Sequence, residues 1–249
     1  MNYIENPNFP KGKSTVVAVS SEAKDVIAAL QSAKICVVPV DPCSSLPEGI
    51  ASHADLQLLH LGSNSMLTAS CSNKCEEMLK SIGFDLKAAS SPLGEKYPAD
   101  CILNAAILGK NIIINPAAAD KLLMEYIYSN NMNIIAVNQG YSNCSILSVC
   151  NDAIITSDRG IAKAAEANGI ETLLINEGGI YLKGYNTGFI GGCGGMIENK
   201  ILGTSGDMKQ LKDFDNIKDF LRNRNIYMEN LGAKELCDIG GILPLCEEL

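Results

Sequence analysis

The chain has 249 residues, of which 47% are hydrophobic and 19% are charged. This composition predicts a buried core and excludes a disordered chain. The 20 Lys and Arg residues against 28 Asp and Glu residues give a net charge of −8. Without a basic cluster we expect no nucleic-acid partner. We also expect no membrane span, because no apolar run reaches roughly 18 residues.

The first 13 residues, MNYIENPNFPKGK, contain acids and prolines and no apolar stretch typical of a signal peptide. We therefore expect a cytoplasmic location, where cysteines stay reduced. The ten cysteines mostly lie in apolar, strand-like segments. They are expected to be small buried side chains rather than a disulfide framework. Cys71 and Cys75 are expected to be two thiols one helical turn apart, since no further ligands with zinc-site spacing follow them.

A repeated pattern of strand, strand, helix and strand runs through the chain. Its clearest copy has strands at 99–108 and 112–115, a helix at 117–130 and a strand at 133–138. The next copy has strands at 143–150 and 153–157, a helix capped by Asp158 and ended by Gly169, and a strand at 170–176. Further copies begin near residues 53 and 188, so the period is about 45 residues, as in repeat proteins.

The first copy lacks its first strand, and the chain ends in a spare strand at 240–249. The simplest arrangement is a ring in which this last strand fills the vacant place beside residues 15–21. The sequence therefore predicts an α/β fold, a five-bladed α/β propeller of ββαβ repeats with pseudo five-fold symmetry, closed by the C-terminal strand. Residues 1–249 are expected to form a single domain. A doubly wound sheet with two lobes is the alternative.

In such a ring the first strand of each unit faces the axis, so polar residues from distant units are expected to meet around a small-molecule ligand in a central channel. His53 and Asp55 are two residues apart and would share one face of a strand, where imidazole and carboxylate act together. Asp158 and Asp207 follow second strands and precede helices. They are candidates both for helix capping and for ligand binding.

Five ββαβ units closed by the last strand resemble the pentein fold. This is the propeller of the guanidino-group-modifying enzymes: arginine deiminase, agmatine deiminase, dimethylarginine dimethylaminohydrolase and the amidinotransferases. Several segments also resemble an uncharacterised bacterial domain family of that fold, namely HAD (53–55), GYSNCS (140–145), ITSDRGI (155–161), GYNTGFIGG (184–192) and DIGGILPL (238–245). The same propeller also forms the ribosome anti-association factor six, which is not an enzyme, so the fold leaves the function open.

The resemblance implies that Cys246 is the nucleophile, because pentein hydrolases carry their catalytic cysteine on the closing strand after a glycine-containing stretch. The thiolate would attack a guanidinium carbon while carboxylates bind the cation and a histidine moves protons. Those enzymes carry the histidine in a later unit, whereas this chain has none after His60.

The candidate catalytic residues are Cys246, His53 and Asp55, and the candidate binding residues are Asp100, Asn104, Asn143, Cys144, Asp158, Asp207 and Asp238. Three alternatives stay open: Cys246 as a structural cysteine, a non-catalytic module that binds a small molecule or a protein, and a metal site built from His53, Asp55, His60 and a cysteine. No cofactor is implied, and the sequence does not give the oligomeric state.

Overall fold

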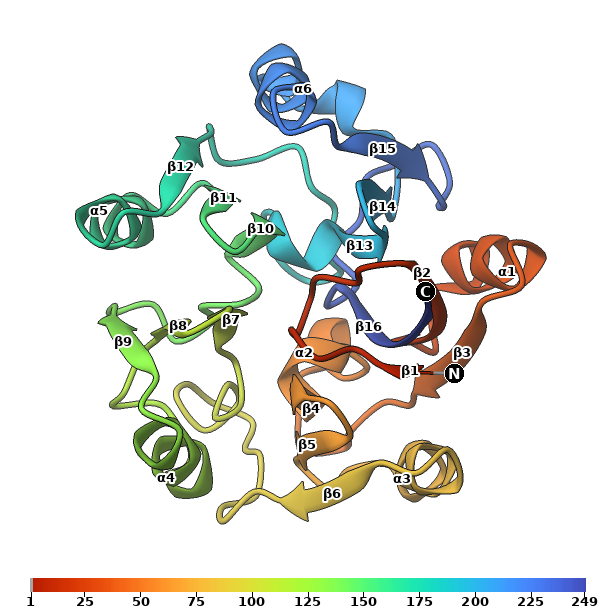
Figure 1. Cartoon of the computed structure of the whole chain (residues 1–249), viewed down its shortest axis with the longest axis vertical. Helices are drawn as coiled ribbons and strands as arrows, with labels where there is room; N and C mark the ends of the chain where they lie inside the picture. The colour runs from red at the N-terminus through yellow and green to blue at the C-terminus, as the bar shows by residue number, and fades with distance from the viewer. Residues whose placement is uncertain (1) are drawn as a thin grey trace.

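The structure, a computed structural model, describes residues 2–249. Four consecutive segments repeat the order strand, strand, helix, strand (Figure 1). The first two are β4 (Leu58–Gly62), β5 (Ser65–Thr68), α3 (Asn73–Ser81), β6 (Asp85–Ala88), and β7 (Ala106–Leu108), β8 (Asn111–Ile114), α4 (Lys121–Ser129), β9 (Asn133–Ala136). The next two are β10 (Ile146–Cys150), β11 (Ala153–Thr156), α5 (Arg159–Ala167), β12 (Glu171–Leu174), and β13 (Gly194–Glu198), β14 (Ile201–Thr204), α6 (Phe214–Arg222), β15 (Tyr227–Asn230).

In each of these units the first strand pairs antiparallel with the second, and the second pairs parallel with the third. The N-terminal segment supplies β1 (Asn2–Tyr3), β2 (Lys13–Ser20), α1 (Lys24–Ser32) and β3 (Cys36–Val40). The missing first strand is β16 (Ile242–Glu248), which lies antiparallel to β2 with Ile242 opposite Val19. The predicted docking of the last strand beside the first is confirmed, and β16 gives this unit the same pairing pattern.

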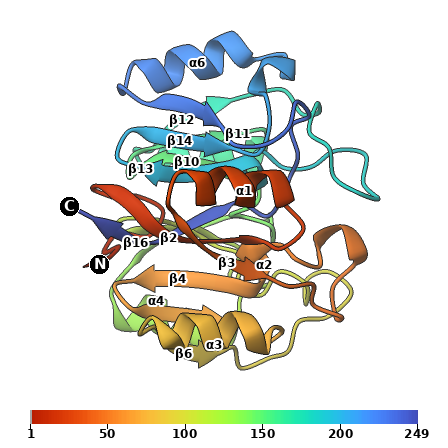
Figure 2. The same cartoon turned by 90° about the vertical axis from the view of Figure 1, so that its right-hand side faces the viewer.

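The helices α1, α3, α4, α5 and α6 lie at the periphery in Figure 1, and the first strands of the units lie nearest the centre. Each helix turns its apolar face inward. On α4, for example, Leu123 and Ile127 are fully buried with Ile112 and Ile114 of β8, and burying each such side chain contributes about 1.5–3 kcal/mol. Figure 2 shows both chain ends on one side of the molecule and α2 (Ala54–Gln57) toward the other.

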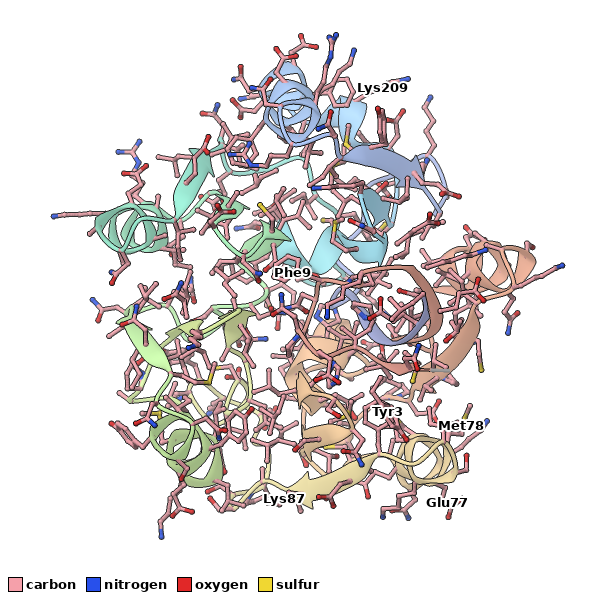
Figure 3. The ribbon with its side chains drawn as sticks, viewed as in Figure 1. Tyr3, Phe9, Glu77, Met78, Lys87 and Lys209 are labelled. Atoms are coloured by element: carbon pink, nitrogen blue, oxygen red, sulfur yellow. A yellow bond between two sulfur atoms is a disulfide. The ribbon has the colours of Figure 1, made fainter. Side chains whose placement is uncertain are left out.

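The N-terminal segment crosses the centre on its way to β2. Phe9, labelled near the centre of Figure 3, packs against two of the hydrophobic clusters. The Asn8 amide donates a hydrogen bond to the Ile107 carbonyl at 3.3 Å. Two small cavities of about 20 Å³ each, both lined by Asn8 and Asn143, lie along this central region. Side chains therefore fill most of the predicted channel.

The first strands of the units begin several residues later in the chain than the sequence predicts. His53 is the N-cap of the short helix α2 rather than a strand residue, and Asp55 lies inside that helix. Likewise β7 begins at Ala106 instead of 99, and β10 at Ile146 instead of 143. Residues 191–193 form a 3₁₀ helix, η2 (Gly191–Cys193), before β13. Polar side chains in these segments bond to neighbouring backbone, which competes with strand pairing.

One expectation about the cysteines is wrong. Cys71 is joined by a disulfide to Cys43, whereas Cys75 is a free buried thiol on α3. The Cys71–Cys75 pair is therefore not a pair of free thiols. None of the helices within residues 2–249 combines the length and apolar character that crossing a bilayer requires.

Candidate functional site

The turns that precede the inner strands meet on one side of the molecule. The backbone N–H of Asp55 in α2 donates to the Gly240 carbonyl at 3.2 Å, which joins α2 to the turn before β16. The N–H of Gly191 donates to the Cys144 carbonyl at 2.8 Å, which joins η2 to the turn before β10. The N–H of Gly241 donates to the Gly192 carbonyl at 3.1 Å and connects these two pairs of segments, so side chains from four units lie close together.

Glycine is required where these turns touch. Gly240 has a φ of +71°, and a Cβ there would lie 2.4 Å from the Cβ of His53. A Cβ on Gly192 would lie 1.7 Å from Oδ1 of Asp238. No real Cβ contact is that short, so a side chain at either position would push the histidine or the carboxylate away from its place.

Asn104 fixes the turn that carries Cys144. Its Oδ1 accepts hydrogen bonds from the backbone N–H groups of Asn143 at 2.8 Å and Cys144 at 3.2 Å. Its Nδ2 donates to the Asp55 carbonyl at 3.0 Å and contacts the Cys144 sulfur at 3.2 Å. One buried amide thus orients both the thiol and the helix that carries the neighbouring carboxylate.

The Cys144 thiol donates to Oδ2 of Asp55 at 2.9 Å, and Asn143 Nδ2 donates to the same oxygen at 3.2 Å. Burial raises the pKa of Cys144 well above its usual value, and the negative charges of Asp55 and Asp238 raise it further. Burial also raises the pKa of Asp55, although the charge of His53 opposes this shift. Without a ligand, Cys144 is a protonated thiol beside a carboxyl group.

His53 and Asp238 face each other across the same site. His53 Nδ1 lies 3.8 Å from Asp238 Oδ1. Asp238 is fixed by backbone donors, because Oδ2 accepts from Phe189 N–H at 2.8 Å and Oδ1 accepts from Gly240 N–H at 3.1 Å. Within residues 2–249 neither ring nitrogen of His53 makes a hydrogen bond, so the imidazole is available to a ligand.

A cavity of about 140 Å³, here called the inner cavity, opens onto these groups. It is lined by Ile50, His53, Leu56, Tyr141, Cys144, Leu182, Tyr185, Thr187, Phe189 and Asp238. The rings of Tyr141 and Phe189 lie with centroids 5.9 Å apart. The cavity therefore places a thiol, an imidazole and a carboxylate opposite an aromatic wall.

A further carboxylate lies behind that wall. Asp100 is 3% exposed, and the Tyr141 hydroxyl donates to its Oδ2 at 2.5 Å. Burial and this carboxylate raise the pKa of Tyr141. Among the described residues, Oδ1 of Asp100 and Oδ1 of Asp55 are buried without a hydrogen-bond partner. Buried acceptors without donors are costly, so both oxygens add unsatisfied negative charge close to the inner cavity.

The structure thus brings together six of the residues singled out in the sequence: His53, Asp55, Asn104, Asn143, Cys144 and Asp238. Asp100 joins them through Tyr141. Phe189 and Tyr185 were not singled out individually. The only sequence signal for them is their place in the segment 184–192, immediately before η2.

Cys246 lies elsewhere. On β16 it is opposite Val16 and packs in an apolar cluster that includes Leu79 and Leu245. Burial raises its pKa to about 11. It is not among the residues that line the inner cavity. The register of the pairing between β16 and β2 shifts on both sides of Cys246. Such a shift turns side chains to the other face of the strand, so the number of residues between Cys246 and the glycines at 240 and 241 does not tell which face Cys246 occupies.

Asp158 and Asp207 are caps. Asp158 Oδ1 accepts from the N–H groups of Gly160 and Ile161 at the start of α5, which confirms the capping prediction. Asp207 caps the 3₁₀ helix η3 (Met208–Gln210) by accepting from Lys209 N–H. Neither lines the inner cavity. In the part of the chain that the structure describes, no three His, Cys, Asp or Glu residues are arranged to hold a metal ion.

Solved structures with a similar fold include amidinotransferases, dimethylarginine dimethylaminohydrolase and agmatine deiminase. Inosamine-phosphate amidinotransferase StrB1 from Streptomyces griseus aligns with a TM-score of 0.62 and 10% identity, over 100% of this chain and 97% of that one. The amidinotransferase SxtG of the saxitoxin pathway from Microseira wollei gives 0.55 and 11%, over 92% and 91%. Agmatine deiminase from C. jejuni gives 0.54 and 10%, over 93% and 90%.

At such low identity the likeness shows the fold alone, and the chain has the pentein fold of the guanidino-group-modifying enzymes. Comparison with curated protein sequences finds no match. A family model described as "Family of unknown function (DUF6873)" matches residues 18–243.

Proposed function

The chain belongs to the DUF6873 family, and we propose that it processes a guanidino compound through a covalent bond to Cys144. The observation that carries this proposal is that Cys144, His53 and Asp238 line one cavity, and that the Cys144 thiol contacts the buried carboxyl group of Asp55 at 2.9 Å. Because Cys246 lies in an apolar cluster, the nucleophile assignment moves from Cys246 to Cys144.

Charge supports a cationic ligand. Asp55, Asp100 and Asp238 are each at most 6% exposed, and no Lys or Arg lines the inner cavity. Buried carboxylates that lack a cation are costly, and a guanidinium ion offers planar N–H donors that match carboxylates. The carboxylate of Asp238, which lines the cavity, would receive those donors, and the negative charge of Asp55 beside Cys144 would add to the attraction. Tyr141 and Phe189 provide ring faces on which a planar cation stacks.

The same charges explain how the thiol would be activated. In the free protein Asp55 and Asp238 disfavour the thiolate. A bound guanidinium neutralises that effect and lowers the pKa of Cys144, because an opposite charge nearby favours the charged form. The thiol proton passes to Oδ2 of Asp55, which already accepts its hydrogen bond. The thiolate then attacks the guanidinium carbon, the C–S bond forms and the C–N bond to the leaving amine breaks. His53, whose nitrogens are free, supplies the proton that the amine takes.

The propeller description belongs to this proposal as well. The pairing order, antiparallel and then parallel, occurs five times when β16 is counted with β2 and β3. The peripheral helices surround the inner strands in Figure 1. We infer a five-bladed α/β propeller with pseudo five-fold symmetry, whose turns before the inner strands form the site.

The test is direct capture of the covalent intermediate. The protein is mixed with agmatine, L-arginine or methylguanidine, quenched with acid, digested and analysed by mass spectrometry. We expect the peptide that contains Cys144 to gain the mass of one amidino group, together with release of the corresponding amine. Cys144→Ser should abolish the gain, and Cys246→Ser, the matched control, should keep it.

An adduct on Cys246 instead of Cys144 would overturn the assignment. Binding without any adduct, seen as a rise in melting temperature with the same compounds, would instead show a non-catalytic binding module.

A further inference from the structure

The size of the inner cavity limits what it can hold. Its volume is about 140 Å³, below the roughly 300–1,000 Å³ of pockets for drug-sized ligands. An engineered apolar cavity of about 150 Å³ in another protein holds a molecule of the size of benzene. A guanidino group already contributes its central carbon and three nitrogens, so the remaining space accommodates a substituent of only a few carbon atoms.

The side chains that line the inner cavity are mainly apolar. Ile50, Leu56 and Leu182 are each at most 6% exposed and belong to one hydrophobic cluster. The rings of Tyr141 and Phe189 pack against the same cluster. An alkyl group placed against these side chains leaves water for an apolar surface, which favours binding by roughly fourfold for each buried CH₂ group.

Three polar side chains on this lining already donate to other groups of the protein. The Tyr141 hydroxyl donates to Asp100 Oδ2 at 2.5 Å, and the Cys144 thiol donates to Asp55 Oδ2 at 2.9 Å. The Thr187 hydroxyl donates to a backbone carbonyl at 3.3 Å. An anionic group on a ligand would have to compete with the protein for each of these donors.

The remaining side-chain donors, His53 and Tyr185, lie beside negative charge. Nδ1 of His53 is 3.8 Å from Oδ1 of Asp238. Burial raises the pKa of Tyr185, and the negative charge of Asp100 raises it further. Within residues 2–249 no Lys or Arg lines this cavity. A ligand carboxylate would therefore be buried without a cation to pair with, which is costly.

We propose that the substrate is a guanidine with one short, uncharged alkyl substituent, and that Ile50, Leu56 and Leu182 select it by contacting the alkyl group. The inference rests on the proposed covalent step at Cys144. Among guanidino compounds, the cavity then favours simple alkylguanidines over guanidino amino acids such as L-arginine, which are larger and carry a carboxylate.

For such a substrate the leaving group is the alkylamine. The Cys144 thiolate attacks the guanidinium carbon and the C–S bond forms. The C–N bond to the nitrogen that carries the alkyl group breaks, and its electron pair stays on that nitrogen, which takes a proton from His53. A neutral alkylamine leaves, and the amidino group stays on the Cys144 sulfur.

Three compounds that differ only at the end of the substituent test this inference. They are n-propylguanidine, 2-aminoethylguanidine and 3-guanidinopropanoate, which end in a methyl group, an ammonium group and a carboxylate. Each is mixed with the protein and quenched with acid at intervals, and the adduct on the peptide that contains Cys144 is measured by mass spectrometry. All three compounds leave the same amidino group on the sulfur, so one mass change reports all three rates.

We expect the adduct to form fastest with n-propylguanidine and at least roughly tenfold more slowly with 3-guanidinopropanoate, the scale of one buried charge without a partner. The aminoethyl compound should react at an intermediate rate, because Asp55 and Asp238 offset part of the cost of burying its ammonium group. A smaller difference for the propanoate, or an aminoethyl rate that equals or exceeds the propyl rate, would overturn this inference and leave the covalent step intact.

A variant that supplies the missing cation tests the charge argument. Tyr185 lines the cavity and is 46% exposed, so a lysine fits there. Tyr185→Lys should raise the propanoate rate relative to the propyl rate by roughly threefold, the scale of one solvent-accessible charge pair. Tyr227→Lys is the matched control, because Tyr227 is exposed on β15 and does not line the cavity. It should leave the ratio unchanged.

An unchanged ratio in Tyr185→Lys would show that charge at the cavity does not set the preference, and would overturn this inference. Adducts with agmatine or L-arginine but none with n-propylguanidine would also overturn it, and the covalent step would stand. The absence of an adduct with every one of these compounds would overturn the proposed function itself.

Discussion

The turn before β10 and the strand β16 each hold a buried cysteine near the centre of the molecule, and their surroundings differ. Cys144 is 2% exposed and contacts a carboxylate and an amide. Cys246 is fully buried among apolar side chains. Burial is the main cause of a raised pKa for both thiols. What separates them is the pair of negative charges beside Cys144, which a cationic ligand can cancel and an apolar cluster cannot.

The strongest test of the difference between Cys144 and Cys246 is to remove each thiol in turn. Cys144→Ala should reduce turnover of a guanidino substrate by roughly 10⁴-fold or more, the scale for loss of a covalent nucleophile. Cys246→Ala should leave turnover unchanged and lower the free energy of unfolding by about 1–2 kcal/mol, because it leaves a small cavity in the core. Steady-state kinetics and denaturant titration measure the two effects.

The opposite pattern, with activity lost in Cys246→Ala and kept in Cys144→Ala, would return the nucleophile to β16. A melting temperature for Cys144→Ala close to that of the unchanged protein shows that its loss of turnover is chemical rather than a loss of folding.

How far the sequence predicts this site depends on how local each interaction is. The repeat order and the Asp158 cap were predictable, because both depend on residues near one another in the chain. The helix at 54–57 was not, since its Asp55 N–H is bonded to Gly240 in a distant segment. For the same reason no pattern could show that Cys144, rather than Cys246, faces a carboxylate. That choice depends on where each inner strand begins, and polar contacts between units decide it.

Two glycines differ in how closely their surroundings pack: Gly240 in the turn before β16, and Gly184 in the connection before η2. Gly240→Ala places a Cβ 2.4 Å from that of His53, at a φ of +71°. We expect a loss of at least about 2 kcal/mol in the free energy of unfolding, from crowding and backbone strain together. Gly184→Ala is the matched control, because its φ is +82° and nothing lies within 4 Å of the added Cβ.

The control should lose only about 1 kcal/mol, the backbone cost alone. Equal losses in the two variants, measured by denaturant titration, would show that the turn before β16 is not packed tightly against His53.

Asp55→Asn should stabilise the protein at neutral pH. Burial raises the pKa of Asp55 in the folded state above its usual 3.8, so the folded state holds the proton more tightly than the unfolded chain. The stability that this proton provides is present below the usual pKa and is lost as pH rises through the folded value. The amide of Asn keeps an acceptor for Cys144 and carries no charge.

We expect the Asn variant to melt a few degrees higher than the unchanged protein at pH 7, since about 1 kcal/mol corresponds to roughly 2–4 °C in a chain of this size. The difference should vanish near pH 4 or below. Asp85→Asn, on the exposed part of β6, should show no such gain. A lower melting temperature for Asp55→Asn across this pH range would mean that Asp55 is paired favourably without a ligand.

The smallest effect concerns the second histidine, His60, which does not line the inner cavity. His60 is buried on β4, with its ring edge-on to Phe84 and Nε2 2.8 Å from the Ser63 carbonyl. Burial lowers its pKa from 6.5 to about 4. Its contribution to stability is therefore complete above the unfolded value of 6.5 and is lost as pH falls toward 4. His60→Phe removes this titration and keeps an aromatic ring, so the melting temperature should fall less steeply over that interval. An unchanged slope would show that His60 is as easily protonated in the folded chain as in the unfolded one.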